Sequence, residues 1–162
     1  MSEGQVLTLG VGGTTSSWED NLGITQLTDF VLAGDWTSNA ITGPIPIIAG
    51  SNYNPAETGV TLLGPGTFEI GETGLYHIIV KSPIDDSATG NLRVQLRDEF
   101  LNILIEDFSV RNNILYNMFT HFIGPIAGGT SITLSGQTDF SGLDVTISAT
   151  LAGGFKLYVL KI

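Results

Sequence analysis

The sequence contains no cysteine and few charged residues. The absence of cysteine excludes disulfides, thiolate metal ligands and thiol catalysis. Charged residues make up 14% of the 162 residues, against about 25% in an average globular domain, and this low charge argues against a disordered chain. No apolar stretch reaches the roughly 18 residues of a membrane span. The N-terminus also lacks the basic and apolar regions of a secretory signal.

Basic residues are absent from the first 80 positions. All six Lys and Arg follow residue 80, whereas sixteen Asp and Glu give a formal net charge of −10. Such a chain repels nucleic acid and anionic membranes. Neither is therefore expected as a partner.

The residues that are abundant favour strands and tight turns. Gly occurs 21 times, and β-branched residues are frequent. Leu92, Val94 and Leu96 alternate with polar residues, which is typical of a half-buried strand. From Ile45 onward, short strands are separated by turn signals, and Gly124-Pro125 is expected to end one of them. This pattern predicts an all-β sandwich or barrel without long helices.

Residues 1–43 differ from the rest and are interpreted as an N-terminal arm with leading strands, followed by one domain over 44–162. The arm contains Val6, Leu7, Leu9 and Val11, and then a connection over 12–17 that is predicted to be flexible. The alternating apolar residues suit a strand that is added to a partner's sheet. The same strand could instead complete the chain's own sheet, and the sequence leaves both alternatives open.

Residues that could carry chemistry are few. His77 and His121 both fall within predicted strands, whereas a Ser-His-Asp site needs an oriented imidazole at a loop or strand end, so we do not expect an enzyme. A third ligand with metal-site spacing is missing, so no metal or other cofactor is predicted. Asp85 and Asp86 could bind calcium, but they lack the spacing of a calcium loop, and a solvated turn is favoured. Glu106-Asp107 is likewise predicted to be a turn.

Several short motifs resemble the tumour necrosis factor and complement q-subcomponent jelly rolls. These motifs are Gly66-Thr67-Phe68, Gly74-Leu75-Tyr76-His77-Ile78, the upstream Asn52-Tyr53-Asn54-Pro55, and the segment 126–132 before a late strand. Thr130 stands where the family usually has Asp. The resemblance covers about residues 45–162. It implies an all-β, ten-strand jelly-roll sandwich that assembles as a homotrimer.

The residues of one strand also favour self-association. Tyr76, Ile78 and Val80 share one face of the strand predicted over 75–81. Leu75 and the two alternate residues that follow it, at positions 77 and 79, make a largely apolar second face. A single sandwich would leave one such face exposed to water, and a symmetric oligomer would cover it. The resemblance implies a trimer interface at five positions: His77, Ile79, Phe119, His121 and Tyr158. The alternative for Phe119 is an ordinary core position.

The function that we expect is structural. Members of the family include cytokines, complement heads, spore-surface proteins and phage capsid decorations, and fold alone does not choose among them. The sequence lacks the signal, anchor, disulfide and collagen stalk of a cytokine. We therefore expect a trimeric decoration or cement protein of a viral capsid, with a bacteriophage as the expected virus. It would be made in the host cytoplasm and would bind the major capsid protein on the outer surface of the capsid. The alternatives are a receptor- or glycan-binding head of a phage fibre or spike, and a bacterial spore-surface or extracellular module.

Overall fold

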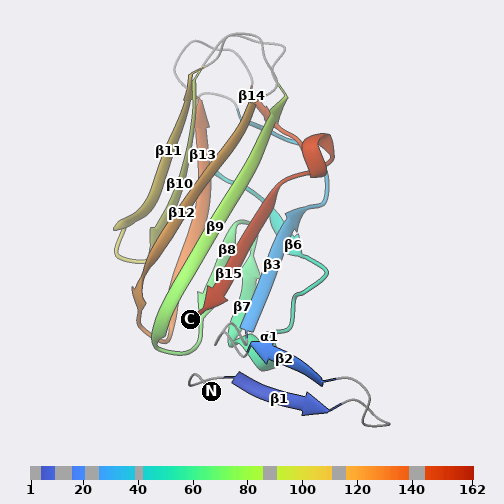
Figure 1. The fold of residues 1–162 in the computed structure, drawn as a ribbon. Coiled ribbons are helices and arrows are strands. Elements are labelled where there is room, and N and C mark those ends of the chain that lie inside the picture. The colour runs from blue at the N-terminus through green and yellow to red at the C-terminus, as the bar shows by residue number, and fades with distance from the viewer. Residues whose placement is uncertain are drawn as a thin grey trace.

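Two antiparallel sheets face each other and enclose the core in the computed structural model of the chain (Figure 1). The structure describes residues 5–9, 16–20, 26–38, 42–85, 91–110, 116–138 and 145–162. The first sheet has six strands in the order β11–β10–β13–β8–β7, with β5 paired to β13. Their bounds are β5 Gly43–Pro44, β7 Val60–Gly64, β8 Thr67–Ile70, β10 Asn91–Asp98, β11 Ile103–Val110 and β13 Thr130–Thr138.

The second sheet has seven strands in the order β4–β14–β9–β15–β3–β6, with β12 paired to β9. Their bounds are β3 Gln26–Leu32, β4 Trp36–Ser38, β6 Ile47–Ala49, β9 Gly74–Asp85, β12 Tyr116–Ile126, β14 Val145–Ile147 and β15 Lys156–Lys161. The strands β3 and β4 come from the segment 1–43, so leading strands of that segment pair within the sandwich. The predicted all-β jelly-roll class is confirmed.

Alternating side chains from both sheets fill the space between them. Phe30 of β3 and Phe68 of β8 are fully buried, and their ring centroids lie 5.2 Å apart across the two sheets. Gly136 of β13 faces Trp36 of β4, and a Cβ atom at this glycine would lie 2.4 Å from the indole Cη2. A larger residue at position 136 would therefore push the sheets apart.

Helices contribute little to the described ranges. The helix α1 covers Pro55–Thr58, and the short 3-10 helix η1 covers Leu151–Gly153. Within the part of the chain that the structure describes, no helix is long and apolar enough to cross a membrane.

Two predicted turns are wrong. Glu106 lies inside β11, where its carboxylate accepts a hydrogen bond from Gln95 Nε2 of β10. The partner across the ladder therefore stabilises an extended conformation there. Gly124-Pro125 does not end its strand, because β12 continues to Ile126. Within its sheet β12 pairs with β9, and a proline is tolerated on an edge strand whose N–H side has no partner.

The N-terminal strands form a separate two-stranded sheet. The strands β1 (Gln5–Leu9) and β2 (Ser16–Asp20) pair with each other, with Leu7 opposite Trp18. They lie beyond the end of the sandwich at which β9 begins (Figure 1). The prediction of a flexible connection over 12–17 is wrong at Ser16 and Ser17, because these two residues begin β2.

Candidate functional site

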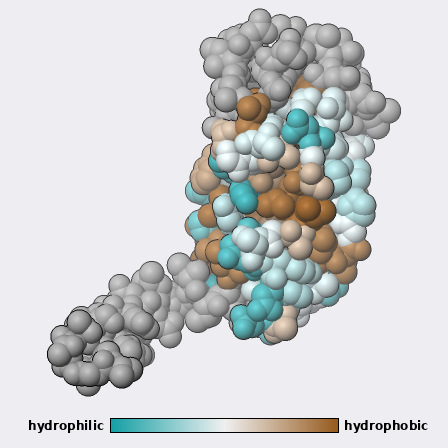
Figure 2. Space-filling view, turned by 90° about the vertical axis from the view of Figure 1, so that its right-hand side faces the viewer, coloured by the Kyte–Doolittle hydropathy of each residue, from teal (hydrophilic) through white to brown (hydrophobic). Residues whose placement is uncertain are grey.

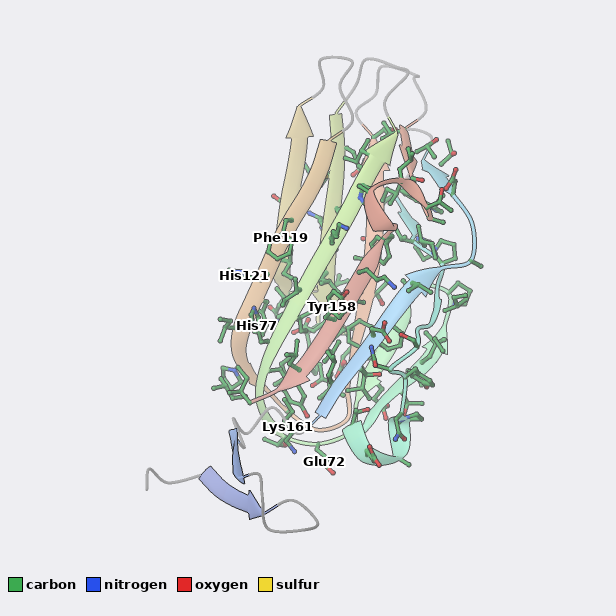
Figure 3. All side chains as sticks on the ribbon, turned by 45° about the vertical axis from the view of Figure 1, so that its right-hand side comes forward. Glu72, His77, Phe119, His121, Tyr158 and Lys161 are labelled. Carbon is green, nitrogen blue, oxygen red and sulfur yellow. The ribbon has the colours of Figure 1, made fainter. Side chains whose placement is uncertain are left out.

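Three neighbouring strands present a largely apolar face on the outside of the second sheet. We call it the outer sheet face, and it lies opposite the core face of β12, β9 and β15 (Figure 3). It consists of Phe119, His121, Ile123 and Pro125 on β12, Leu75, His77, Ile79 and Lys81 on β9, and Lys156, Tyr158 and Leu160 on β15.

The strand register arranges these side chains in rows. Ile79 stands between His121 of β12 and Tyr158 of β15. In the next row, His77 stands between Ile123 and Leu160. The five residues predicted to form a trimer interface therefore share one face of three adjacent strands. Their role in self-association stays a prediction.

The apolar residues of this face are exposed in the single chain. Phe119 exposes 63% of its surface, Ile123 56% and Leu75 43%. The alternative that Phe119 is an ordinary core residue is therefore wrong. The inner side of β9 shows the opposite pattern, because Tyr76, Ile78 and Val80 are buried there. Cross-strand neighbours on one face interact directly, so these exposed residues form one connected surface.

The apolar surface extends around the sandwich. Figure 2 shows a brown area in the middle of the side on which β3 and β6 lie. These two strands contribute the partly exposed Leu27 and Ile48. Large connected apolar surfaces on soluble proteins commonly mark interaction sites.

The two histidines contact each other on the outer sheet face. Their ring centroids are 5.4 Å apart and the rings are nearly perpendicular, at 81°. Nε2 of His77 is shielded from solvent and has no hydrogen-bond partner among the described residues. Each imidazole thus faces the other imidazole and apolar neighbours, which differs from the hydrogen-bonded base of a catalytic triad.

Two of the lysines belong to this face, and a third lies at the end of the sandwich. Lys81 lies opposite Lys156, and its Nζ donates a hydrogen bond to the carbonyl of Ala152. At the end of the sandwich, Lys161 forms a salt bridge with Glu72, and the hydrogen bond to this carboxylate raises the pKa of the lysine. Lys161 is thereby drawn towards Glu72 at the end of the sandwich.

A rigid turn between β10 and β11 holds two apolar side chains in solvent. Phe100 is 76% exposed and Leu101 is 70% exposed, and the backbone of Leu101 has a φ of 66°. The carboxylate of Asp98 accepts hydrogen bonds from Phe100 N (3.0 Å), Asn102 N (2.8 Å) and Asn102 Nδ2 (2.7 Å). These bonds, the one from the Asn102 side chain above all, lower the pKa of Asp98. We call Phe100 and Leu101 the turn tip.

A hollow of about 210 Å³ adjoins the turn tip. Phe100 and Leu104 line it from the turn side, and Pro125 and Ala127 line it from the end of β12 and the residues that follow. The turn tip and the hollow thus form a second, smaller surface that is accessible in the single chain.

Other predicted residues lie apart from these surfaces. Val6, Leu7 and Leu9 fall in β1, and Val11 lies outside the described residues. Asp85 ends β9 and is therefore not part of a polar turn, and Asp86 lies outside the described residues. Within the described ranges, no group of three His, Asp or Glu residues could hold a metal ion.

Sequence reasoning missed Ile123 and the turn tip. Ile123 alternates with Phe119 and His121, so the period-two pattern could have placed it on the same face. The signal for the turn tip is the placement of Phe and Leu directly after Asp98-Glu99, in a segment where small polar residues would ordinarily be expected.

The arrangement of the strands is that of a tumour necrosis factor-like jelly roll. Murine APRIL at pH 5.0 is similar in structure, with a TM-score of 0.64, 11% identity, and coverage of 84% of this chain and 98% of that chain. Eiger TNF from S. frugiperda gives a TM-score of 0.62 and 15% identity, with coverage of 85% and 92%. The likeness at these identities concerns the fold alone. No family model matches the sequence, and no curated protein is similar to it in sequence.

Proposed function

We propose that the chain is a non-enzymatic, homotrimeric jelly-roll protein of a virion, which decorates and stabilises the outer surface of a phage capsid. The observation that carries the self-association is the outer sheet face, on which Phe119, Ile123 and Leu75 are exposed on the same side of β12 and β9. Covering apolar area is the main driving force of association, and a closed symmetric assembly covers this face in every copy.

The attachment is assigned to the hairpin of β1 and β2. It pairs outside both sheets of the sandwich, and an isolated two-stranded hairpin is at best marginally stable in water. Docking on a partner would stabilise it. A trimer carries three such hairpins, so modest contacts of each with capsid subunits combine into tight attachment.

A truncation tests this assignment. Removal of residues 1–20 deletes both hairpin strands and leaves the strands of the sandwich intact. We expect the truncated protein to remain a folded trimer and to lose co-sedimentation with capsids built from the major capsid protein of the same virus. A control chain carries a Gly/Ser segment of equal length in place of the hairpin and should behave like the truncation. Capsid binding by either variant would contradict the docking role.

The second candidate function is a receptor- or glycan-binding head, and the turn tip favours it. Exposed aromatic residues on loops are typical of binding surfaces, and Phe100 is the most exposed large apolar residue among the described ones. The non-glycine residue at positive φ beside it is a local strain of the kind found at functional sites. Retained capsid binding by Phe100→Ala, together with loss of binding to host-cell surfaces or a glycan array, would favour this candidate over the capsid role.

A further inference from the structure

The contact between His77 and His121 places two titratable rings on the face that is proposed to be covered. The two residues are diagonal neighbours across β9 and β12, because His77 pairs with Ile123 and His121 pairs with Ile79. Both lie on the same side of the sheet (Figure 3). Histidine is the side chain that ordinarily changes charge between about pH 5 and pH 8. Any proton taken up there adds a positive charge to an apolar surface.

The described residues offer one ring nitrogen of His77 no hydrogen-bond acceptor. A neutral imidazole can leave one nitrogen without a hydrogen, whereas the imidazolium carries a proton on both nitrogens. Nε2 of His77 is shielded from solvent and finds no acceptor within the described residues. A proton on Nε2 would therefore be an unsatisfied buried donor, which is costly.

Two lysines lie on the same face as the pair. On β9 the charged neighbour is Lys81, and on β15 the titratable groups are Lys156 and Tyr158. From Met118 to Ile126, β12 contributes only His121. Asp29 of β3 lies opposite Tyr158, and its carboxylate is buried and accepts the backbone N–H of Asn52. A symmetric contact brings the same groups from every copy, so Lys81 and Lys156 of each copy lie on the covered face.

We infer that the outer sheet face is a pH-sensitive contact, which holds the copies together when His77 and His121 are neutral and releases them in mild acid. This inference rests on the proposed self-association. Covering the face removes the imidazoles from water, and the loss of hydration disfavours their charged form. The assembled state therefore binds fewer protons than the separated chains. By linkage, association weakens as the pH falls through the range in which histidine titrates.

The size of the effect follows from the number of protons. If the contact between the two rings limits each copy to one additional proton, a trimer takes up three protons when it dissociates. The association constant of the trimer then falls about a thousandfold per pH unit in the acidic part of the range. The half-dissociation concentration varies as the inverse square root of that constant and therefore rises about thirtyfold per pH unit there.

The experiment measures the half-dissociation concentration of the full chain by sedimentation equilibrium, from about pH 8 to about pH 5. The chain contains two histidines and no cysteine, so besides the N-terminal amine only His77 and His121 ordinarily titrate in this range. In the wild type we expect the half-dissociation concentration to rise as the pH falls, by about thirtyfold per pH unit in the acidic part of the range. The double variant His77→Gln/His121→Gln should remain assembled in mild acid and lose the dependence. His121→Gln, at the exposed ring, serves as a second variant if the double variant does not fold.

Each further outcome has a distinct meaning. A trimer whose half-dissociation concentration does not change with pH overturns the inference and leaves the self-association standing. The same pH dependence in the wild type and in the glutamine variants also overturns it, because the protons would then be bound elsewhere. A monomer at every pH overturns the self-association and the inference together.

Discussion

Replacement of Phe119 by alanine separates a role in association from a role in folding. In the single chain this side chain is 63% exposed on β12, so its removal should affect the stability of the sandwich little. In a trimer that meets through the outer sheet face, the same ring would be covered in every copy. We therefore expect Phe119→Ala to weaken association strongly while the melting temperature of the separated chain stays nearly constant.

The magnitude follows from the exposed area. An aromatic residue can bury roughly 200 Å², so an exposure of 63% leaves about 130 Å² for a partner to cover. At about 25 cal/mol per Å², covering this area stabilises the trimer by about 3 kcal/mol per copy and about 9 kcal/mol in total. Loss of that free energy corresponds to about a thousandfold rise in the half-dissociation concentration, which varies as the inverse square root of the association constant.

Sedimentation equilibrium at neutral pH measures the change, and the turn tip provides a matched control. Phe100 is 76% exposed, lies on the loop between β10 and β11 and is not part of the outer sheet face. Phe100→Ala should leave association unchanged. If Phe119→Ala assembles like the wild type, or if Phe100→Ala dissociates to the same extent, the assignment of the interface to the outer sheet face is wrong.

Three further predictions concern the fold and the rigid turn. Phe68→Ala removes a ring from the centre of the core and should lower the free energy of unfolding by about 3–5 kcal/mol in urea titrations, and a loss below about 1 kcal/mol would contradict the packing described. Gly136→Val places a side chain against Trp36 and should destabilise the sandwich by about 1–3 kcal/mol, so an unchanged urea midpoint would refute this contact. Asp98→Asn should lower the melting temperature at neutral pH. The hydrogen bonds lower the pKa of Asp98 in the folded state, so the stabilisation by this carboxylate is present above the ordinary aspartate range and is lost as the pH falls through the lowered pKa. The difference in melting temperature between the variant and the wild type should therefore vanish in strong acid. A difference that persisted there would contradict this origin.

Much of the fold could be predicted because its signal is local. The alternation of apolar and polar residues around Leu92, Val94 and Leu96 is present in the sequence, and these three residues are buried in β10. The continuation of β12 through Pro125 could not be predicted in this way. A proline is tolerated there because of the position of the strand at the edge of its sheet, and that position depends on pairing with a strand far away in the sequence.

The candidate site was predictable only in part, for the same reason. Sequence pattern and resemblance placed His77 and His121 in strands, but their contact depends on the register between β9 and β12. A shift of one residue in that register would turn one strand's side chains to the other face. The exposure of Phe100 and Leu101 depends on the hydrogen bonds of a single turn, which periodicity over longer segments does not detect.

The mass of the intact chain in solution tests the central claim most directly, because the proposed function requires self-association through the outer sheet face. Light scattering coupled to size exclusion, at micromolar concentration and about pH 8, should return about 52 kDa, three copies of the 17.2-kDa chain. A single species of 17.2 kDa would contradict the account.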